Sequence, residues 1–249
     1  MEIDRKLMTA FLDGRFQEKY GAGSCLWRFY AWQPFAVTIG YNQDLAGIDR
    51  EKCLSAGIDV VRRPTGGRAV FHADEFTYSF FMDSPGSNSE LYRMVHEVIR
   101  LALRGLGIDA GFCRSTLSDA KAAGHAGSVS CFTASARHEL QVDGRKLVGS
   151  AQRRTRGVLL QHGSLPLSGR HKELSSLIAS GAEIVSEEIR KEMERKTVSL
   201  EELLGYLPAY SRIAELMQQA AGEISGLVPG SLGPDALSFL LESREFSIQ

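Results

Sequence analysis

The sequence has few cysteines and no long apolar run, and each absence excludes a class of protein. Its 249 residues include four cysteines, which lie far apart and form no C-x-x-C pair. This spacing is not that of a disulfide-stapled domain or a structural zinc site. No stretch reaches the ~18 consecutive apolar residues of a membrane-spanning helix, and the opening MEIDRKLMTAFLDG lacks a signal-peptide core. We therefore expect a cytoplasmic protein with no membrane partner.

An excess of charge of one sign is also missing. The chain has 29 Lys and Arg against 30 Asp and Glu, a formal net charge of −1. A balanced charge gives no general attraction to nucleic acid, so we expect no nucleic-acid partner and only local basic sites. With 43% hydrophobic residues, the chain can bury a sizeable core without disulfides or metals.

Strand patterns fill the first two thirds of the chain, and helical patterns fill the rest. Four runs are rich in aromatic and β-branched residues and predict strands, at 26–32, 36–41, 58–63 and 76–82. After Ser168 the pattern is almost purely helical. We predict an α+β fold, with a mixed or antiparallel sheet and packed helices. Residues 1–167 would form the main domain and residues 168–249 a helical C-terminal extension.

A loop rich in glycine and arginine separates two of the predicted strands, in the stretch VRRPTGGRAVFH. Gly66 and Gly67 have no Cβ, so their backbone can approach a ligand closely. Arg62, Arg63 and Arg68 can pair with carboxylate or phosphate oxygens. The loop lacks the spacing of known nucleotide-binding loops. On this stretch alone, a ligand loop and a simple turn with solvated arginines both remain open.

A second candidate site surrounds the pair Asp143–Gly144, the strongest signal for a two-residue hairpin turn. Lys146 and Gly149 follow this turn, and Cys131 precedes it among small residues. A thiol on an accessible loop can act as a nucleophile if a nearby ammonium favours its thiolate form. An exposed strand lysine and an inert cysteine are the structural alternatives.

The histidines form no metal-binding motif. His72, His138 and His162 do not have the H-E-x-x-H spacing or a comparable one. Isolated histidines are more often hydrogen-bonded structural residues, and we therefore predict no metal.

The order of these motifs resembles that of the lipoate–protein ligase and octanoyltransferase family, which is related to the biotin–protein ligases. The resemblance rests on IDRKLM, LWRFYAWQPFAVTIGYNQ, RRPTGGRAVFH, EFTYSF, GRKLVGSAQ and LLQHGS, and it covers roughly residues 2–167. It implies a biotin/lipoate-protein-ligase-like fold. Cys131 stands where the cysteine-dependent octanoyltransferases of the family carry their nucleophile.

For this branch, the resemblance implies an acyltransferase that needs no cofactor. Octanoyl-acyl carrier protein would be the donor, and a lysine of a lipoyl domain, such as that of the glycine cleavage H protein, the acceptor. Cys131 and Lys146 would be catalytic residues. The substrate-binding residues would be Arg62, Arg63, Gly66, Gly67, His72 and Gly149.

Three alternatives remain open at this stage. The chain could be an ATP-dependent lipoate–protein ligase, which needs no thiol, or a lipoyl amidotransferase with similar thiol chemistry. It could also be a binding module without activity, although a binder needs no nucleophile. The run Arg153, Arg154 and Arg156 is a candidate docking patch for an acidic carrier protein, and a solvated surface is the alternative.

Overall fold

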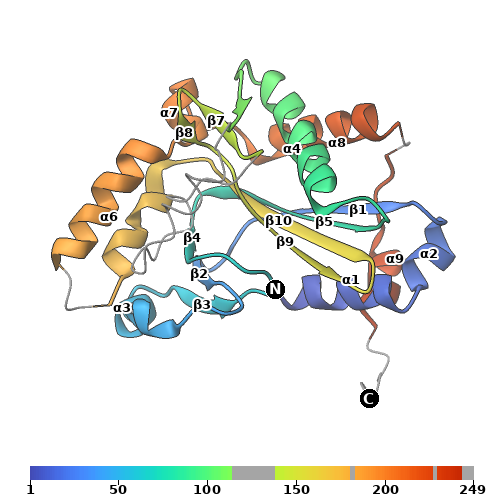
Figure 1. Ribbon diagram of the computed structural model, residues 1–249, viewed down its shortest axis with the longest axis horizontal. Helices are drawn as coiled ribbons and strands as arrows, with labels where there is room; N and C mark the ends of the chain where they lie inside the picture. The colour runs from blue at the N-terminus through green and yellow to red at the C-terminus, as the bar shows by residue number, and fades with distance from the viewer. Residues whose placement is uncertain (114–137, 180–182, 227–228, 243–249) are drawn as a thin grey trace.

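The described part of the chain forms three sheets and a surrounding set of helices (Figure 1). The computed structural model describes residues 1–113, 138–179, 183–226 and 229–242. The central sheet has the strand order β1-β5-β10-β9 and is antiparallel throughout. Its strands are β1 (Cys25–Tyr30), β5 (Glu75–Asp83), β9 (Gly149–Thr155) and β10 (Val158–Pro166).

Strand β5 lies in the interior of this sheet, and its alternating side chains serve two separate cores. Phe76, Tyr78 and Phe80 face one core, while Phe81 faces the other. Successive residues of a strand point to opposite faces. In a strand that is buried on both faces, nearly every side chain must therefore be apolar or have a hydrogen-bond partner. The sequence EFTYSFFMD meets that requirement.

The helices cover both faces of the central sheet. On one side α4 (Asn88–Arg104) and α8 (Tyr210–Ser225) pack together, and on the other lie α1 (Glu2–Leu12), α2 (Arg15–Tyr20) and α9 (Pro234–Leu241). Helix α4 begins with a capping box, in which Ser87 and Glu90 satisfy each other's backbone amides. Its buried stripe includes Val95 and Val98.

A smaller sheet with the order β3-β2-β4 packs beside the central one. It consists of β2 (Ala36–Ile39), β3 (Asp59–Arg62) and β4 (Val70–His72). Strand β2 pairs in parallel with β3 and antiparallel with β4. The predicted strands at 26–32 and 36–41 thus form, but they belong to different sheets.

A third sheet presents the predicted hairpin. Strands β7 (Leu140–Val142) and β8 (Arg145–Lys146) pair antiparallel, and β6 (Gly111–Phe112) extends the sheet. Asp143 and Gly144 both have positive φ, at 50° and 73°. This is the type I′ turn that the Asp-Gly pair predicts, so the hairpin is confirmed.

After β10 the described chain is helical. The helices are η2 (Gly169–Leu177), α6 (Glu183–Lys196), α7 (Leu200–Leu204), α8 and α9. They contribute to the shared cores, and the Val198 amide donates to the Lys146 carbonyl at 3.0 Å. The predicted α+β class with helices at its C-terminal end is confirmed. Among the described helices, none is both long and apolar enough to cross a membrane.

Candidate active site

A small pocket, part of it open to solvent, lies between the central sheet and the β3-β2-β4 sheet. The central sheet contributes one wall through the facing ends of β9 and β10. These residues are Gly149, Ser150, Ala151, His162, Gly163 and Ser164. Glycine is required at Gly163, because a Cβ there would lie 2.5 Å from Ser150 Oγ and 2.6 Å from a ring carbon of Tyr78.

A buried carboxylate, that of Glu75 at the start of β5, links the central sheet to the opposite wall. Glu75 accepts hydrogen bonds from His72 Nδ1 at 2.6 Å and from the hydroxyls of Thr77 and Ser164. The other ring nitrogen of His72, Nε2, lies 2.7 Å from Thr38 Oγ1. Such a fully connected network holds each member in one orientation, because an unsatisfied buried polar group is costly.

Arg63 joins this network to the glycine loop. Its Nη1 donates to Thr38 Oγ1 at 3.1 Å, and its Nη2 donates to the carbonyls of Gly66 at 2.9 Å and Arg68 at 2.6 Å. The side chain is only 5% exposed. Gly67 adopts a φ of 97°, which favours glycine. The loop is therefore held from inside by an arginine, rather than being a turn with solvated side chains.

One end of the pocket is aromatic. The ring of Trp32 stacks on His72 with centroids 4.5 Å apart and planes 23° apart. Its Nε1 donates to Thr77 Oγ1 at 3.0 Å. Tyr30 and Val70 also line the space. Half of the lining residues are polar, but the surface that they expose to the pocket is mostly apolar. A narrow cavity of this kind suits an aliphatic chain.

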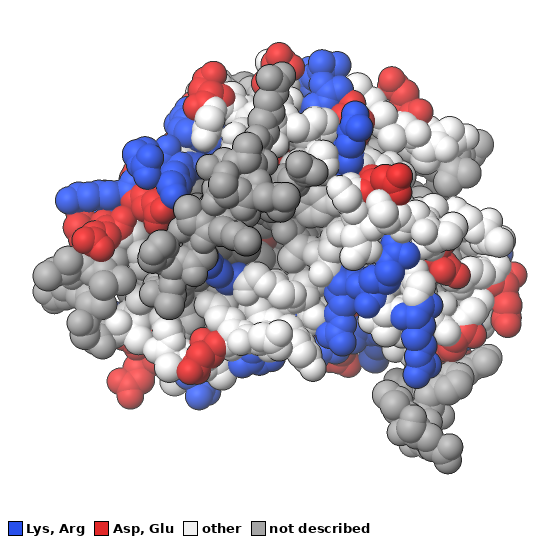
Figure 2. All heavy atoms as spheres, in the orientation of Figure 1, with Lys and Arg blue, Asp and Glu red and all other residues white. Residues whose placement is uncertain are grey.

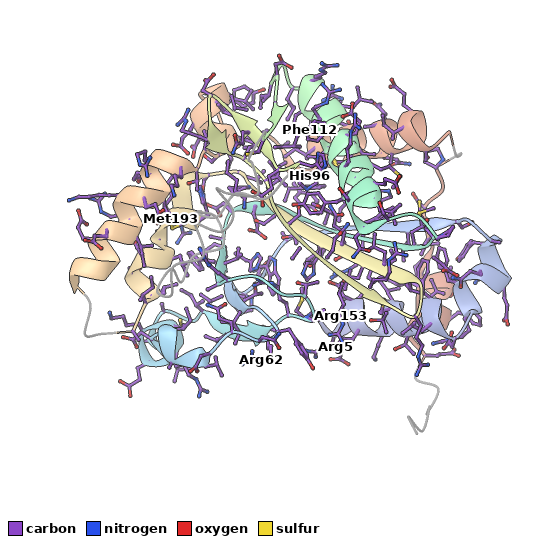
Figure 3. The ribbon with its side chains drawn as sticks, in the orientation of Figure 1. Arg5, Arg62, His96, Phe112, Arg153 and Met193 are labelled. Atoms are coloured by element: carbon purple, nitrogen blue, oxygen red, sulfur yellow. The ribbon has the colours of Figure 1, made fainter. Side chains whose placement is uncertain are left out.

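A second polar chain supports the β9–β10 wall from behind. His96 donates from Nδ1 to the His138 carbonyl at 2.7 Å, because a carbonyl only accepts. Its Nε2 therefore accepts from Ser150 Oγ at 2.8 Å, and Tyr78 in turn donates to Ser150 at 2.7 Å. Burial lowers the pKa of His96 to about 3. His96 lies inside the fold (Figure 3) and is neutral near pH 7.

A third cluster surrounds His162, which lines the pocket. Its Nε2 is 2.6 Å from Thr65 Oγ1, and burial lowers the pKa of its ring. Asp4 lies on the other side of the ring and is paired with Arg28 at 2.8 Å. Burial alone would raise the pKa of Asp4, but interactions with His162 and the charge of Arg28 hold it below its ordinary value.

Lys146 is buried on the third sheet and forms an ion pair. Its Nζ lies 2.7 Å from Oε1 of Glu139, and the two side chains are 3% and 4% exposed. A parallel bridge to Thr197 and the bond from Val198 fix its backbone. A lysine held in this way presents a positive charge in surroundings where water screens it little.

The structure distributes the predicted site residues over three places. Arg63, His72 and Gly149 line the pocket. Lys146 precedes Gly149 on the chain and is buried beside Glu139. Three other predicted residues are not among those that line the pocket: Arg62 donates to carbonyls of the 40–43 loop, and Gly66 and Gly67 are exposed. Cys131 lies outside the described residues.

Several residues at the site were missed in the sequence. Glu75 is the first residue of a mostly apolar strand. A carboxylate at the start of such a strand was the only feature of the sequence that indicated a buried polar site. Trp32 follows a predicted strand and carried no signal for a pocket. Glu139 lies seven residues before Lys146, but across the hairpin the two side chains meet. Gln141 is the register partner of Lys146, so Glu139 is a diagonal neighbour on the same face of the hairpin. An acidic residue diagonal to a lysine across a two-residue turn is a pattern that could have been used.

Comparison with known proteins identifies the family. The chain belongs to the lipoyl protein ligase A/B catalytic domain family, whose sequence profile matches residues 4–224. The octanoyltransferase LipM of Kyrpidia tusciae is 38% identical over 93% of this chain and 85% of its own length. LipM of Bacillus subtilis is 38% identical over 71% of this chain and 66% of its own length. The predicted family and the expected acyltransferase class are confirmed.

Solved structures confirm the predicted lipoate-ligase-like fold. A bipartite lipoate protein ligase from Thermoplasma acidophilum superposes with a TM-score of 0.70 at 19% identity, over 94% of this chain and 85% of that one. A lipoate-protein ligase A bound with ATP gives a TM-score of 0.66 at 18% identity, over 94% and 87%. At these identities, the match establishes the fold alone.

Proposed function

We propose that this protein transfers an octanoyl group from octanoyl-acyl carrier protein to a lysine of a lipoyl domain, such as that of the glycine cleavage H protein, in the cytoplasm. The observation that carries the proposal is the 38% identity to an octanoyltransferase over 93% of the chain. The narrow, partly aromatic pocket between the sheets supports it, since an eight-carbon chain needs an apolar slot.

The reaction would proceed through an acyl-thioester on Cys131. The thiolate attacks the carbonyl carbon of the donor, so one C–S bond forms and the donor C–S bond breaks. The proton of the Cys131 thiol leaves with the pantetheine thiol. The deprotonated acceptor amine then attacks the carbonyl carbon of the acyl-cysteine. An amide C–N bond forms, the C–S bond to Cys131 breaks, and a proton from the attacking amine goes to the cysteine sulfur. The amide is more stable than the thioester, so no ATP is consumed.

Lys146 would supply positive charge during both steps. The ammonium stabilises the thiolate of Cys131 and the oxyanion that develops on the acyl carbonyl. Its ion pair with Glu139 keeps it in one place before the substrate arrives. Lys146 comes three residues before Gly149, which lines the pocket, and this short separation along the chain supports a reacting carbonyl at this end.

The remaining predicted residues would bind the acyl group and its polar end. Arg63 and His72 form part of the pocket wall, and their positions are fixed by Glu75 and Thr38. The backbone of Gly66 and Gly67 would lie beside the arm of the donor where it enters. Arg62 lies next to that entrance.

Two alternative activities within the same family would use different acyl donors. An ATP-dependent lipoate–protein ligase would act on the free acid with ATP and Mg²⁺, and it would tolerate Cys131→Ala. A lipoyl amidotransferase would take the acyl group from an acylated H protein with no carrier protein present. The structural similarity to a ligase reflects the fold and favours neither alternative.

Intact-protein mass spectrometry tests the proposal. Wild type and Cys131→Ser are mixed with octanoyl-acyl carrier protein in the absence of ATP. We expect an octanoyl increment on wild type alone, removed by hydroxylamine, followed by transfer to a lipoyl domain. If no increment forms and the amide appears only with free acid and ATP, the ligase is the correct assignment. Transfer from acylated H protein alone would indicate the amidotransferase.

A further inference from the structure

Three arginines from distant parts of the chain meet at the edge of the pocket. Arg5 comes from α1, Arg62 from the end of β3 and Arg153 from β9 (Figure 3). Arg5 Nη2 donates to the Arg62 carbonyl at 3.2 Å, and Arg153 Nη1 donates to the Pro64 carbonyl at 2.9 Å. In Figure 2, basic side chains gather on this face of the molecule.

An exposed tyrosine connects these arginines. The guanidinium carbon of Arg153 lies 5.0 Å from the ring centre of Tyr41, a cation–π distance. Arg62 Nη1 donates to the carbonyl of Tyr41 at 2.8 Å, and the Tyr41 side chain is 54% exposed. We call Arg5, Arg62, Arg153 and Tyr41 the arginine surface.

The three guanidinium groups are anchored but leave donors for a partner. Each uses one nitrogen on backbone carbonyls: Nη2 of Arg5, Nη1 of Arg62 and Nη1 of Arg153. Within the described part of the chain, no carboxylate lies within 4 Å of any of them. Their remaining N–H groups can therefore donate to an incoming anion. Preorganised guanidinium donors suit phosphate and carboxylate oxygens.

The arginine surface adjoins the entrance of the pocket. Arg62 precedes Arg63, which lines the pocket, and Arg153 lies two residues after Ala151, which also lines it. Residues two apart in a strand point to the same face. Arg154 points the opposite way and donates to the carbonyls of Ser84 and Gly86. The run of arginines at 153–156 is thus not one patch, and Arg153 belongs with Arg5 and Arg62.

We infer that the arginine surface is the docking site for the donor, an acidic acyl carrier protein whose acyl group is attached through a phosphodiester. This inference rests on the proposed function. The chain as a whole has a net charge of −1, so a local positive surface is what attracts and orients an acidic protein. The surface binds the carrier's carboxylates and the phosphodiester, and the adjoining pocket receives the acyl end.

The test compares two donors on variants of the full-length protein. Arg5→Glu/Arg153→Glu reverses two charges and keeps Arg62, which holds the 40–43 loop. Octanoyl-acyl carrier protein is the anionic donor, and octanoyl-pantetheine is a neutral donor with the same thioester but no phosphate and no protein. We expect KM for the carrier protein to rise about tenfold or more, with KM and kcat for octanoyl-pantetheine unchanged. The neutral donor also shows that the variant is folded.

Arg195→Glu is the matched control. Arg195 is exposed on α6, away from α1 and β9 (Figure 1), and its substitution gives the same charge change per residue. We expect its KM for the carrier protein to stay at the wild-type value. An unchanged KM in the double variant, or an equal rise in the control, would overturn the proposal. A rise only in KM for the lipoyl domain would also overturn it, because the surface would then bind the acceptor.

Direct binding separates this inference from the proposed function. The apo carrier protein is titrated onto wild type and the double variant at low and moderate salt. Weaker binding of the variant and a smaller salt dependence are expected. If wild type transfers no octanoyl group, the proposed function fails. The titration still decides the docking site, since binding that is equal in both proteins refutes it.

Discussion

Nζ of Lys146 lies 2.7 Å from Oε1 of Glu139, and water reaches almost none of either side chain. A buried ion pair contributes little net stability compared with an apolar pair, but removing one partner leaves the other charge uncompensated. The pair is therefore more valuable for placing the lysine than for holding the fold together.

Replacing Glu139 should show how far the stability of the fold depends on a charged partner for Lys146. Glu139→Gln is expected to lower the free energy of unfolding by about 3 kcal/mol, because it leaves the Lys146 ammonium buried without its carboxylate. The double variant Glu139→Gln/Lys146→Met should recover part of that loss. Urea unfolding of the wild type, both single variants and the double variant measures the coupling. Strictly additive effects would mean that the two side chains do not interact.

The carboxylate of Glu75 should be needed for the shape of the pocket. It accepts from His72, Thr77 and Ser164, and the amide of Glu75→Gln would place a donor against one of these donors. We expect a loss of about 2–3 kcal/mol and a raised KM for the acyl donor. Urea unfolding and donor kinetics measure the two effects, with Glu173→Gln, on an exposed side chain, as control. Wild-type values in Glu75→Gln would contradict the network.

The buried histidines should make the protein sensitive to mild acid. Burial lowers the pKa of His96 to about 3 in the folded state, whereas an unfolded histidine titrates near its ordinary ~6.5. Between these values only the unfolded chain binds the proton, so stability falls as the pH falls below ~6.5. For this residue, the free energy of unfolding falls by at most about 1.4 kcal/mol per pH unit.

Unfolding of wild type and His96→Gln at pH 7 and pH 5 tests this prediction. The variant should be less stable at pH 7 but should lose less stability on acidification. His171 supplies a second contribution of the same sign, since burial lowers its pKa to about 4. An equal pH dependence in both proteins would show that folding does not lower the pKa of His96.

Arg153 and Arg154 are neighbours in the chain and should behave differently. Arg154 donates to the carbonyls of Ser84 and Gly86 and to Asn88 Oδ1 at 2.8 Å, so it ties β9 to the loop before α4. Arg154→Ala should cost about 1–3 kcal/mol of stability. Arg153→Ala should change stability by at most about 0.5 kcal/mol. Thermal unfolding of both variants provides the comparison, and a reversed order would contradict the strand geometry.

Local features of this fold could be predicted from the sequence. The Asp143–Gly144 turn depends on the backbone preferences of two residues, and the start of α7 depends on a capping box between Ser199 and Glu202. Such signals act over a few positions, so their outcome hardly depends on the rest of the fold. The helix at 88–104 could also be predicted, because its apolar stripe repeats over several turns.

The pocket could not be predicted in the same way. Trp32 and His72 stack because two different sheets bring them together, and Glu75 meets Ser164 because β5 pairs with β10. These contacts depend on strand order, which periodicity does not encode. The arginines at 153–156 are a candidate for one patch because they are close in sequence. In a pleated strand, however, the adjacent Arg153 and Arg154 point to opposite faces.

The bond from the Val198 amide to the Lys146 carbonyl has a consequence for the newly made chain. The ribosome adds Lys146 well before Thr197 and Val198, so the hairpin that bears the lysine emerges with one edge unpaired. That edge is completed only when the segment following α6 has been synthesised and has folded back. A truncated or nascent chain would expose the strand to association with other chains. Acyl transfer would therefore begin only after the segment following α6 has left the ribosome.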